Sequence, residues 1–291
     1  MFRYGLVCSL ETLTPDKPSV FQGPLEGYAD KVRSIGYDAL ELHLRNPGQV
    51  DPDKLRRRAN DAGLDFCALS TGLEYGLNHL SLISDEARVR QAAIRRLTEH
   101  IDLAAELSCG VVIGTMRANI PDMRQKTRYL GYLSEALLTL SDYAAPRQVP
   151  LLVESITRYI DNYLNTVPET AAYLLGLSRP NLLLHIDTHS MQIEDPDFAA
   201  AIRASAPVLG YVHVSDSNRR FPGGGNIDFK VVLRELRAIG YSGVVTSECL
   251  PWPDAERSAR LGLSYLKALE TCLDVESYRL APAEPERMSH D

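Results

Sequence analysis

The chain has 291 residues, a length that suits one α/β barrel of about 250 residues with modest additions. Hydrophobic residues make up 45% and charged residues 24% of it, as in ordinary globular proteins. The net charge of −7 argues against a nucleic-acid partner, which would need a basic face. No apolar run approaches the roughly 20 residues of a membrane span, and no signal peptide is recognisable. We therefore expect a cytoplasmic protein without a membrane partner.

Short apolar runs recur along the chain and predict eight strands: residues 5–10, 39–44, 66–69, 111–113, 150–153, 182–186, 210–214 and 244–245. Longer segments with helical periodicity separate them, and residues 88–107 are the clearest of these. Strands that are apolar on both faces and alternate with helices indicate a parallel sheet. Eight such units in a chain of this length predict a single (β/α)8 barrel, also called a TIM barrel.

The predicted catalytic barrel domain covers residues 1–280, with residues 12–24 as the loop after the first strand. Residues 281–291 contain several Pro and Glu residues and are expected to form a mobile C-terminal tail. Glycine suits the residue that ends a helix, because it adopts a left-handed backbone conformation without strain. Four glycines are expected to end helices in this way: Gly36, Gly63, Gly110 and Gly240.

Four consecutive predicted strands, the fifth to the eighth, end in residues that can bind a metal. They are Glu154, Asp187, His213 and Glu248. The carboxyl ends of all strands of a TIM barrel meet at one mouth, where the active site forms. Three carboxylates and an imidazole crowded there would shift one another's pKa values unless a cation neutralised the charge. The pattern predicts one divalent metal, and its oxygen-rich ligands favour Mn²⁺, Mg²⁺ or Co²⁺, with Zn²⁺ left open.

Other polar residues near the strand ends are candidates for substrate contact. The loop after the seventh strand is glycine-rich but lacks the ending of a P-loop, and we expect it to turn Arg219 over the mouth. Arg219 could bind a substrate hydroxyl or carboxylate, or form a structural salt bridge. His189 is a second candidate, with a polar loop residue as its alternative. Arg117 is a third, with a surface ion pair as its alternative. His185 is expected to be a core histidine with its hydrogen bonds satisfied, and His43 is left unassigned.

Several motifs lie around these strand ends. Glu154 is followed by the letters TRY at 157–159, Asp187 lies within IDT at 186–188, and residues 213–219 read HVSDSNR. Residues 240–243 read GYSG ahead of Glu248. With these motifs the sequence resembles the xylose-isomerase-like superfamily of sugar-phosphate isomerases and epimerases, and most of all the ketose 3-epimerases. In the N-terminal half, the letters LRNP at 44–47, STG at 70–72 and LSL at 80–82 resemble the branch that contains 5-keto-L-gluconate epimerase.

The resemblance implies that Glu154, Asp187, His213 and Glu248 bind a single Mn²⁺ or Co²⁺. It also implies that Glu154 and Glu248 exchange protons with one substrate carbon from opposite faces, which inverts that carbon. The metal would stabilise the negative charge that forms on the substrate when the proton leaves. The implied function is a metal-dependent epimerase or isomerase of a ketose or keto-sugar acid, assembled as a homo-oligomer.

Two positions depart from the family pattern. Ketose 3-epimerases usually carry a glutamate where this chain has Ile160, and a histidine where it has Ser190, with His189 one position earlier. Both family residues contact substrate, whereas Arg219 matches a third contact that is kept. The sequence therefore leaves the substrate open.

Other functions stay open beside the epimerase. A lyase could perform β-elimination on an oxidised sugar or glycoside at the same metal site. A non-catalytic sugar-binding barrel is a further alternative. An endonuclease with a three-zinc cluster is disfavoured by the seven histidines and the acidic composition.

Overall fold

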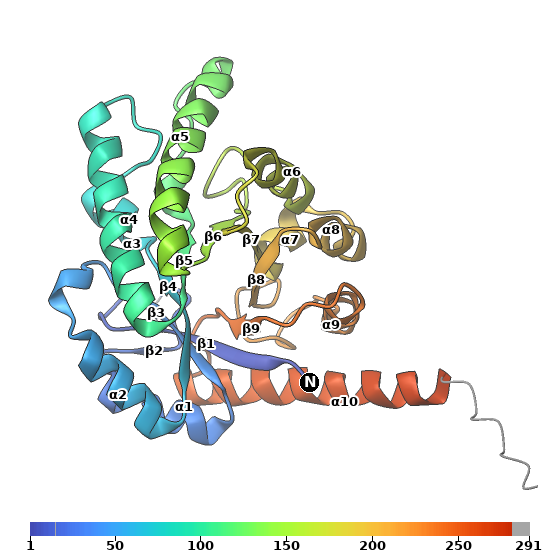
Figure 1. Cartoon of the computed structure of the whole chain (residues 1–291). Helices are drawn as coiled ribbons and strands as arrows, with labels where there is room; N and C mark the ends of the chain where they lie inside the picture. Colours follow the sequence, from blue (N-terminus) through green and yellow to red (C-terminus); the bar gives the residue numbers. More distant parts are fainter. Residues whose placement is uncertain (15, 281–291) are drawn as a thin grey trace, which may run out of the picture.

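The computed structural model describes residues 1–14 and 16–280 (Figure 1). Within these residues, eight parallel strands pair in sequence order, and the last pairs back with the first. The predicted single (β/α)8 barrel is thereby confirmed. The barrel strands are β1 (Arg3–Ser9), β3 (Ala39–His43), β4 (Asp65–Ser70), β5 (Gly110–Ile113), β6 (Leu151–Glu154), β7 (Leu182–Asp187), β8 (Leu209–Val214) and β9 (Val244–Ser247).

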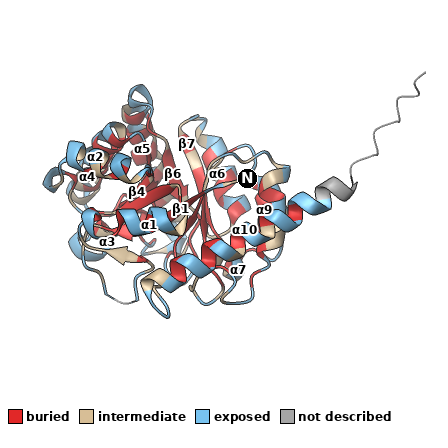
Figure 2. Ribbon diagram, turned by 90° about the horizontal axis from the view of Figure 1, so that it is seen from below, coloured by how far each residue is buried: buried red, intermediate tan, exposed pale blue. Residues whose placement is uncertain are grey.

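Helices surround the barrel and bury its outer face, while their own outer faces are exposed (Figure 2). They are α1 (Ala29–Ile35), α2 (Pro52–Ala62), α3 (Leu73–Asn78), α4 (Ala87–Leu107), α5 (Lys126–Ala144), α6 (Val167–Leu177), α7 (Thr188–Glu194), α8 (Phe198–Ser205), α9 (Phe229–Ala238) and α10 (Ala255–Leu280). None of the helices in the described part of the chain has the length and apolar character needed to cross a membrane. The predicted tail, residues 281–291, lies outside the described residues.

The residues that end the helices follow the expected chemistry with one exception. Gly36 ends α1 with φ 111° and Gly63 ends α2 with φ 71°, and Gly240 follows α9 with φ 72°. The prediction for Gly110 is wrong, because Ser108 ends α4 in the left-handed conformation and Gly110 opens β5. A Cβ atom at Gly110 would lie 2.8 Å from the Leu152 side chain, so glycine favours the close packing of β5 on β6 there.

The loop after β1 contains a short strand that the sequence did not indicate. β2 (Phe21–Gln22) pairs with Cys8 and Ser9 at the upper end of β1. β9 pairs only with the lower part of β1, from Arg3 to Leu6. The upper end of β1 therefore has a free edge, and β2 covers it.

The interior of the barrel changes from apolar to polar along each strand. A small apolar cluster of Ala68, Val112, Leu152 and Tyr211 forms the floor. Side chains of a strand alternate between its two faces, so the residue two positions further along points into the same interior. On β6 and β8 these residues are Glu154 and His213, and the interior becomes polar towards the carboxyl ends of the strands.

Candidate active and metal site

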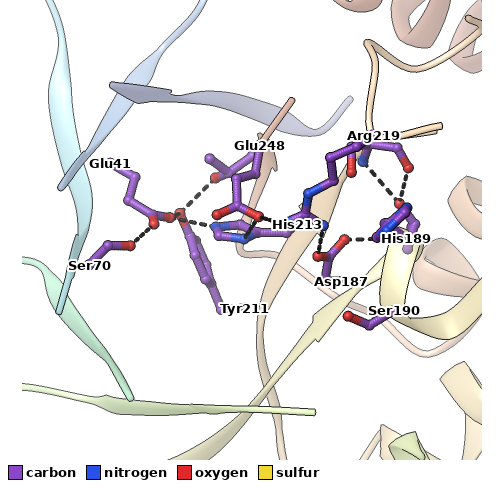
Figure 3. Close-up of polar contacts among 12 residues, drawn as sticks. Glu41, Ser70, Asp187, His189, Ser190, Tyr211, His213, Arg219 and Glu248 are labelled. Atoms are coloured by element: carbon purple, nitrogen blue, oxygen red, sulfur yellow. Dashed lines mark hydrogen bonds and ion pairs between the residues drawn. The ribbon is translucent and has the colours of Figure 1, made fainter. Parts of the chain in front are cut away.

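A cavity of about 420 Å³ lies at the carboxyl ends of the strands. All four residues predicted as metal ligands line it, and so do the predicted substrate contacts Arg219 and His189. The Arg219 side chain contacts both Asp187 and Glu248, and Glu248 also lies beside His213 (Figure 3). The structure therefore gathers in one place residues that are spread over nearly a hundred positions of the sequence.

The strand ends place these side chains around one cavity. Glu154 and Asp187 are the last residues of β6 and β7, and Asp187 is the register partner of His213 on β8. Glu248 follows directly after β9. Gly114, directly after the neighbouring strand β5, leaves room for Glu154 because it has no side chain. A Cβ atom there would lie 2.5 Å from the Glu154 Oε2 atom.

Arg219 reaches over the mouth, as the glycine-rich loop predicted. Its guanidinium forms ion pairs with both Asp187 and Glu248. The Arg219 backbone adopts a left-handed conformation with φ 61°, which is uncommon outside glycine and costs free energy. Two backbone hydrogen bonds fix this turn: the Arg219 N–H donates to Asp216 O at 2.8 Å, and Leu250 N–H donates to Arg219 O at 2.8 Å.

The crowded charges shift the pKa values of the acidic residues in opposite directions. Burial, together with the negative charges of Glu248 and Asp187, raises the pKa of Glu154. Burial would also raise the pKa of Glu248, but the positive charges of Arg219 and His213 outweigh it and lower this pKa. The pair therefore combines a carboxyl group that favours its proton with a carboxylate that releases it, which is the arrangement needed for acid and base chemistry at one site.

The two ring nitrogens of His213 have different surroundings. Its Nε2 atom lies 2.6 Å from Glu41 Oε2, whereas its buried Nδ1 atom has no hydrogen-bond partner in the described structure. The Nδ1 atom lies 3.4 Å from Glu248 Oε2. Burial lowers the pKa of His213, but the carboxylates of Glu41 and Glu248 outweigh it and raise this pKa above its usual range.

A second histidine also has unpartnered nitrogens. His185 is fully buried on the same face of β7 as Asp187, and its ring lies edge-on to His213 with centroids 4.1 Å apart. The prediction of a core histidine holds for its burial but is wrong for its hydrogen bonds, because neither ring nitrogen has a partner among the described residues. Burial, the largest cause, lowers its pKa well below the usual range.

These side chains fit a divalent cation. Glu154, His185 and His213 each offer one ligand atom, and these atoms lie within 4.8 Å of one another. This group shares Glu154 and His213 with the predicted ligand set, whereas Asp187 and Glu248 are turned towards Arg219. An unpartnered, buried imidazole nitrogen beside several carboxylates is the donor set that such an ion prefers.

The remaining substrate-contact candidates divide between the cavity and the interior. His189 lines the cavity beside Ser190 and Ile160, and its backbone N–H donates to Asp187 Oδ1 at 2.9 Å. Arg117 is fully buried, pairs with Asp161 at 2.9 Å, and is not among the residues that line the cavity. A surface ion pair for Arg117 is therefore wrong, and its placement gives no support to a substrate contact.

Three residues that sequence reasoning did not assign belong to this site. Glu41 and His43 lie on the inner face of β3, and Ser70 ends β4. His43 and Ser70 line the cavity, and Glu41 lies beneath it. Two ionisable residues spaced two apart in an otherwise apolar strand were the available sign, because they had to share the inner face.

The fold and the cavity together define a class of protein. A closed parallel barrel with acidic side chains and imidazoles around a cavity at its strand ends is a TIM-barrel enzyme. Residues 29–269 match the family model described as xylose isomerase-like TIM barrel. The chain belongs to this family.

Curated relatives narrow the class. An L-ribulose 3-epimerase of Mesorhizobium japonicum is 33% identical over 78% of this chain and 76% of its own length. A ketose 3-epimerase of Arthrobacter globiformis is 32% identical over 75% of each chain. A 3-dehydro-D-guloside 4-epimerase of Escherichia coli is 31% identical over 75% of this chain and 84% of its own.

A solved structure of a sugar epimerase has the same fold as this chain. An L-ribulose 3-epimerase structure has a TM-score of 0.81 and 26% identity, and the match covers 98% of this chain and 100% of that one. The relatives are sugar epimerases, and the chain is an enzyme of the sugar epimerase and isomerase class.

Proposed function

We propose that the protein is a divalent-metal-dependent epimerase or isomerase of a ketose or keto-sugar acid, and that Glu154 and Glu248 exchange the proton. The observation that carries this proposal is the placement of the two glutamates. Glu154 enters the cavity from β6 and Glu248 from the end of β9, with β7 and β8 between them. Two carboxyl groups that approach one cavity from different strands can reach opposite faces of a substrate carbon.

We propose Glu154, Asp187, His213 and Glu248 as the residues that hold the metal, with Mn²⁺ as the first candidate ion. The unpartnered His213 Nδ1 atom and the three carboxylates support this assignment. When bound, such an ion would stabilise the negative charge that develops on a carbonyl oxygen of the substrate.

The side chains of the protein then divide the remaining work. One glutamate, as its carboxylate, takes the proton from the substrate carbon, and the other, as its carboxylic acid, returns a proton to the opposite face. Arg219, from the loop after β8, and His189, from the first turn of α7, orient the substrate oxygens. Delivery from the opposite face inverts the carbon, which is epimerisation.

The relatives guide the choice of substrate to be tested. Two of them are named for 3-epimerisation of ketoses and one for 4-epimerisation of a 3-dehydro-guloside. Ile160 and Ser190 line the cavity of this chain where ketose 3-epimerases usually have a glutamate and a histidine. A ketose or a keto-sugar acid that forms fewer polar contacts near the reacting carbon fits this wall. We further propose a cytoplasmic homo-oligomer.

Incubation of the Mn²⁺-loaded protein with ketoses and keto-sugar acids in D₂O, followed by NMR at each carbon, tests the proposal. We expect deuterium to enter at one carbon next to a carbonyl, together with an epimer of the substrate and no loss of a leaving group. Chelation of the metal should stop the exchange, and added Mn²⁺ should restore it. Release of a leaving group would instead show a lyase, and binding without exchange would show a non-catalytic barrel.

A further inference from the structure

We propose that Glu41 is the positioning residue of the metal site: it holds His213 through Nε2 and thereby presents His213 Nδ1 to the metal. This inference rests on the proposed function, because it concerns the same metal. It adds a residue from the N-terminal half of the barrel to a site that the sequence placed wholly on β6 to β9. Glu41, on β3, lies 172 positions from His213 in the chain.

The Glu41 carboxylate is completely buried and accepts three hydrogen bonds. Its Oε2 atom accepts hydrogen bonds from His213 Nε2 at 2.6 Å and from the Tyr211 hydroxyl at 2.6 Å. Its Oε1 atom accepts a hydrogen bond from the Ser70 hydroxyl. Figure 3 shows Glu41, Ser70 and Tyr211 gathered on the side of His213 that faces away from Asp187. Both oxygens of Glu41 thus already accept hydrogen bonds.

The position of Glu41 separates it from the proposed ligands. Among the described residues that line the cavity are His43 and Ser70, but not Glu41. Glu41 therefore lies behind the His213 ring as seen from the cavity. A buried carboxylate in this place needs donors or a positive charge close by. Of the two imidazoles beside Glu41, His213 is the nearer at 2.6 Å, and His43 Nε2 lies 3.9 Å from Glu41 Oε1.

The contact decides which nitrogen of His213 faces the cavity. Metal binding requires the neutral imidazole, which carries one proton, and the hydrogen bond made by one ring nitrogen fixes that proton and the ring orientation. A proton on Nε2, donated to Glu41, leaves a lone pair on Nδ1, the buried atom without a partner. A carboxylate that accepts from the far nitrogen of a metal-binding histidine also makes the near nitrogen a stronger ligand, and its loss typically weakens metal binding about 10- to 100-fold.

Glu41→Gln is the variant that tests this role, because it keeps the size of the side chain and removes its charge. We expect the dissociation constant for Mn²⁺, measured by calorimetry on the metal-free protein, to rise about 10- to 100-fold. Glu270→Gln is the matched control. Glu270 is also a buried carboxylate that accepts from a tyrosine hydroxyl, that of Tyr4 at 2.9 Å, but it lies on α10 and does not line the cavity. Its variant should bind Mn²⁺ as the unaltered protein does.

The outcomes separate this inference from the proposed function. If the unaltered protein and Glu41→Gln bind Mn²⁺ equally, the positioning role is overturned and the proposed metal site stands. If the unaltered protein binds no Mn²⁺, both are overturned. A crystal structure of the Mn²⁺-loaded, unaltered protein decides the case in which Glu41→Gln does not fold. We expect His213 Nδ1 at the metal and Nε2 on Glu41, and a metal bound through Nε2 or directly by Glu41 overturns the inference.

Discussion

The two halves of the barrel mouth contribute different things to the cavity. In the C-terminal half, β6 to β9 each end at or next to an ionisable side chain that faces the cavity. In the N-terminal half, the strands and the loops that follow them supply small or apolar residues such as Leu13, Gly72, Leu73 and Val112. The C-terminal half is thus the more densely charged one, although Asp16, Lys17 and His43 also line the cavity from the N-terminal half.

The difference shows how one barrel can hold reactive side chains on one side and the residues that position them on the other. Charged groups close together on one side interact strongly, which is seen in the opposite pKa shifts of Glu154 and Glu248. The N-terminal half supports these groups from beneath the cavity. There the Ser70 hydroxyl donates to Glu41, and Glu41 accepts a hydrogen bond from His213. Variants of the proton-exchanging glutamates in the charged half should therefore lose turnover even under saturating Mn²⁺, whereas a variant of Glu41 should mainly lose metal affinity.

The largest expected effect comes from the charged half. Glu154→Gln and Glu248→Gln each replace a carboxyl group that we propose to transfer the proton, and the new side chain has about the same size. We expect turnover to fall about 10²- to 10⁴-fold in either variant, because positioned acid and base groups contribute about this much. The measurement is epimer formation by NMR under saturating Mn²⁺. Glu169→Gln, an exposed change on α6, should leave turnover unchanged, and normal turnover in either cavity variant contradicts the two-glutamate mechanism.

The second effect tests how the halves are joined. Arg117, after β5, and Asp161, after β6, form an ion pair with side chains 0% and 1% exposed. Asp161→Ala leaves the guanidinium buried without its partner, so we expect the free energy of unfolding to fall by about 3–5 kcal/mol. Urea unfolding measures this loss. The exposed pair of Arg179 and Asp142 provides the control, since Asp142→Ala should change stability little. An equally small change for Asp161→Ala would mean that the buried pair contributes nothing.

The sequence predicted which charged side chains gather at the cavity, but it did not predict the residues that support them. Glu154, Asp187, His213 and Glu248 were recognisable because each follows its own apolar run, and the barrel brings all strand ends to one mouth. The contact of Glu41 with His213 was not predictable, because it exists only once β3 and β8 face each other across the closed barrel. The ion pairs of Arg219 with Asp187 and Glu248 depend in the same way on side-chain orientation, which a linear pattern does not contain. Gly110 was misassigned because glycine serves both helix ends and close strand packing.

The smallest effect distinguishes a functional carboxyl group from a structural one within the charged half. Asp195, between α7 and α8, is as buried as Glu248 but is not among the residues that line the cavity. Burial raises its pKa from the usual 3.8 to about 6, and its carboxylate accepts a hydrogen bond from Val167 N–H at 3.2 Å. A raised pKa therefore does not by itself mark a residue of the active site, and the effect of Asp195 should appear in stability alone.

The sign of this effect follows from proton binding. Between about pH 4 and pH 6 the folded chain keeps the Asp195 proton and the unfolded chain has lost it, so the contribution of this group to stability falls as the pH rises through this window. Asp195→Asn keeps the hydrogen-bond acceptor and cannot ionise. A shift of one pKa unit corresponds to about 1.4 kcal/mol, and partial contact with solvent reduces the effect. We expect the variant to gain about 1 kcal/mol over the unaltered protein between pH 4 and pH 7 in urea unfolding. Turnover should not change, and a stability difference independent of pH would show that Asp195 is ionised throughout.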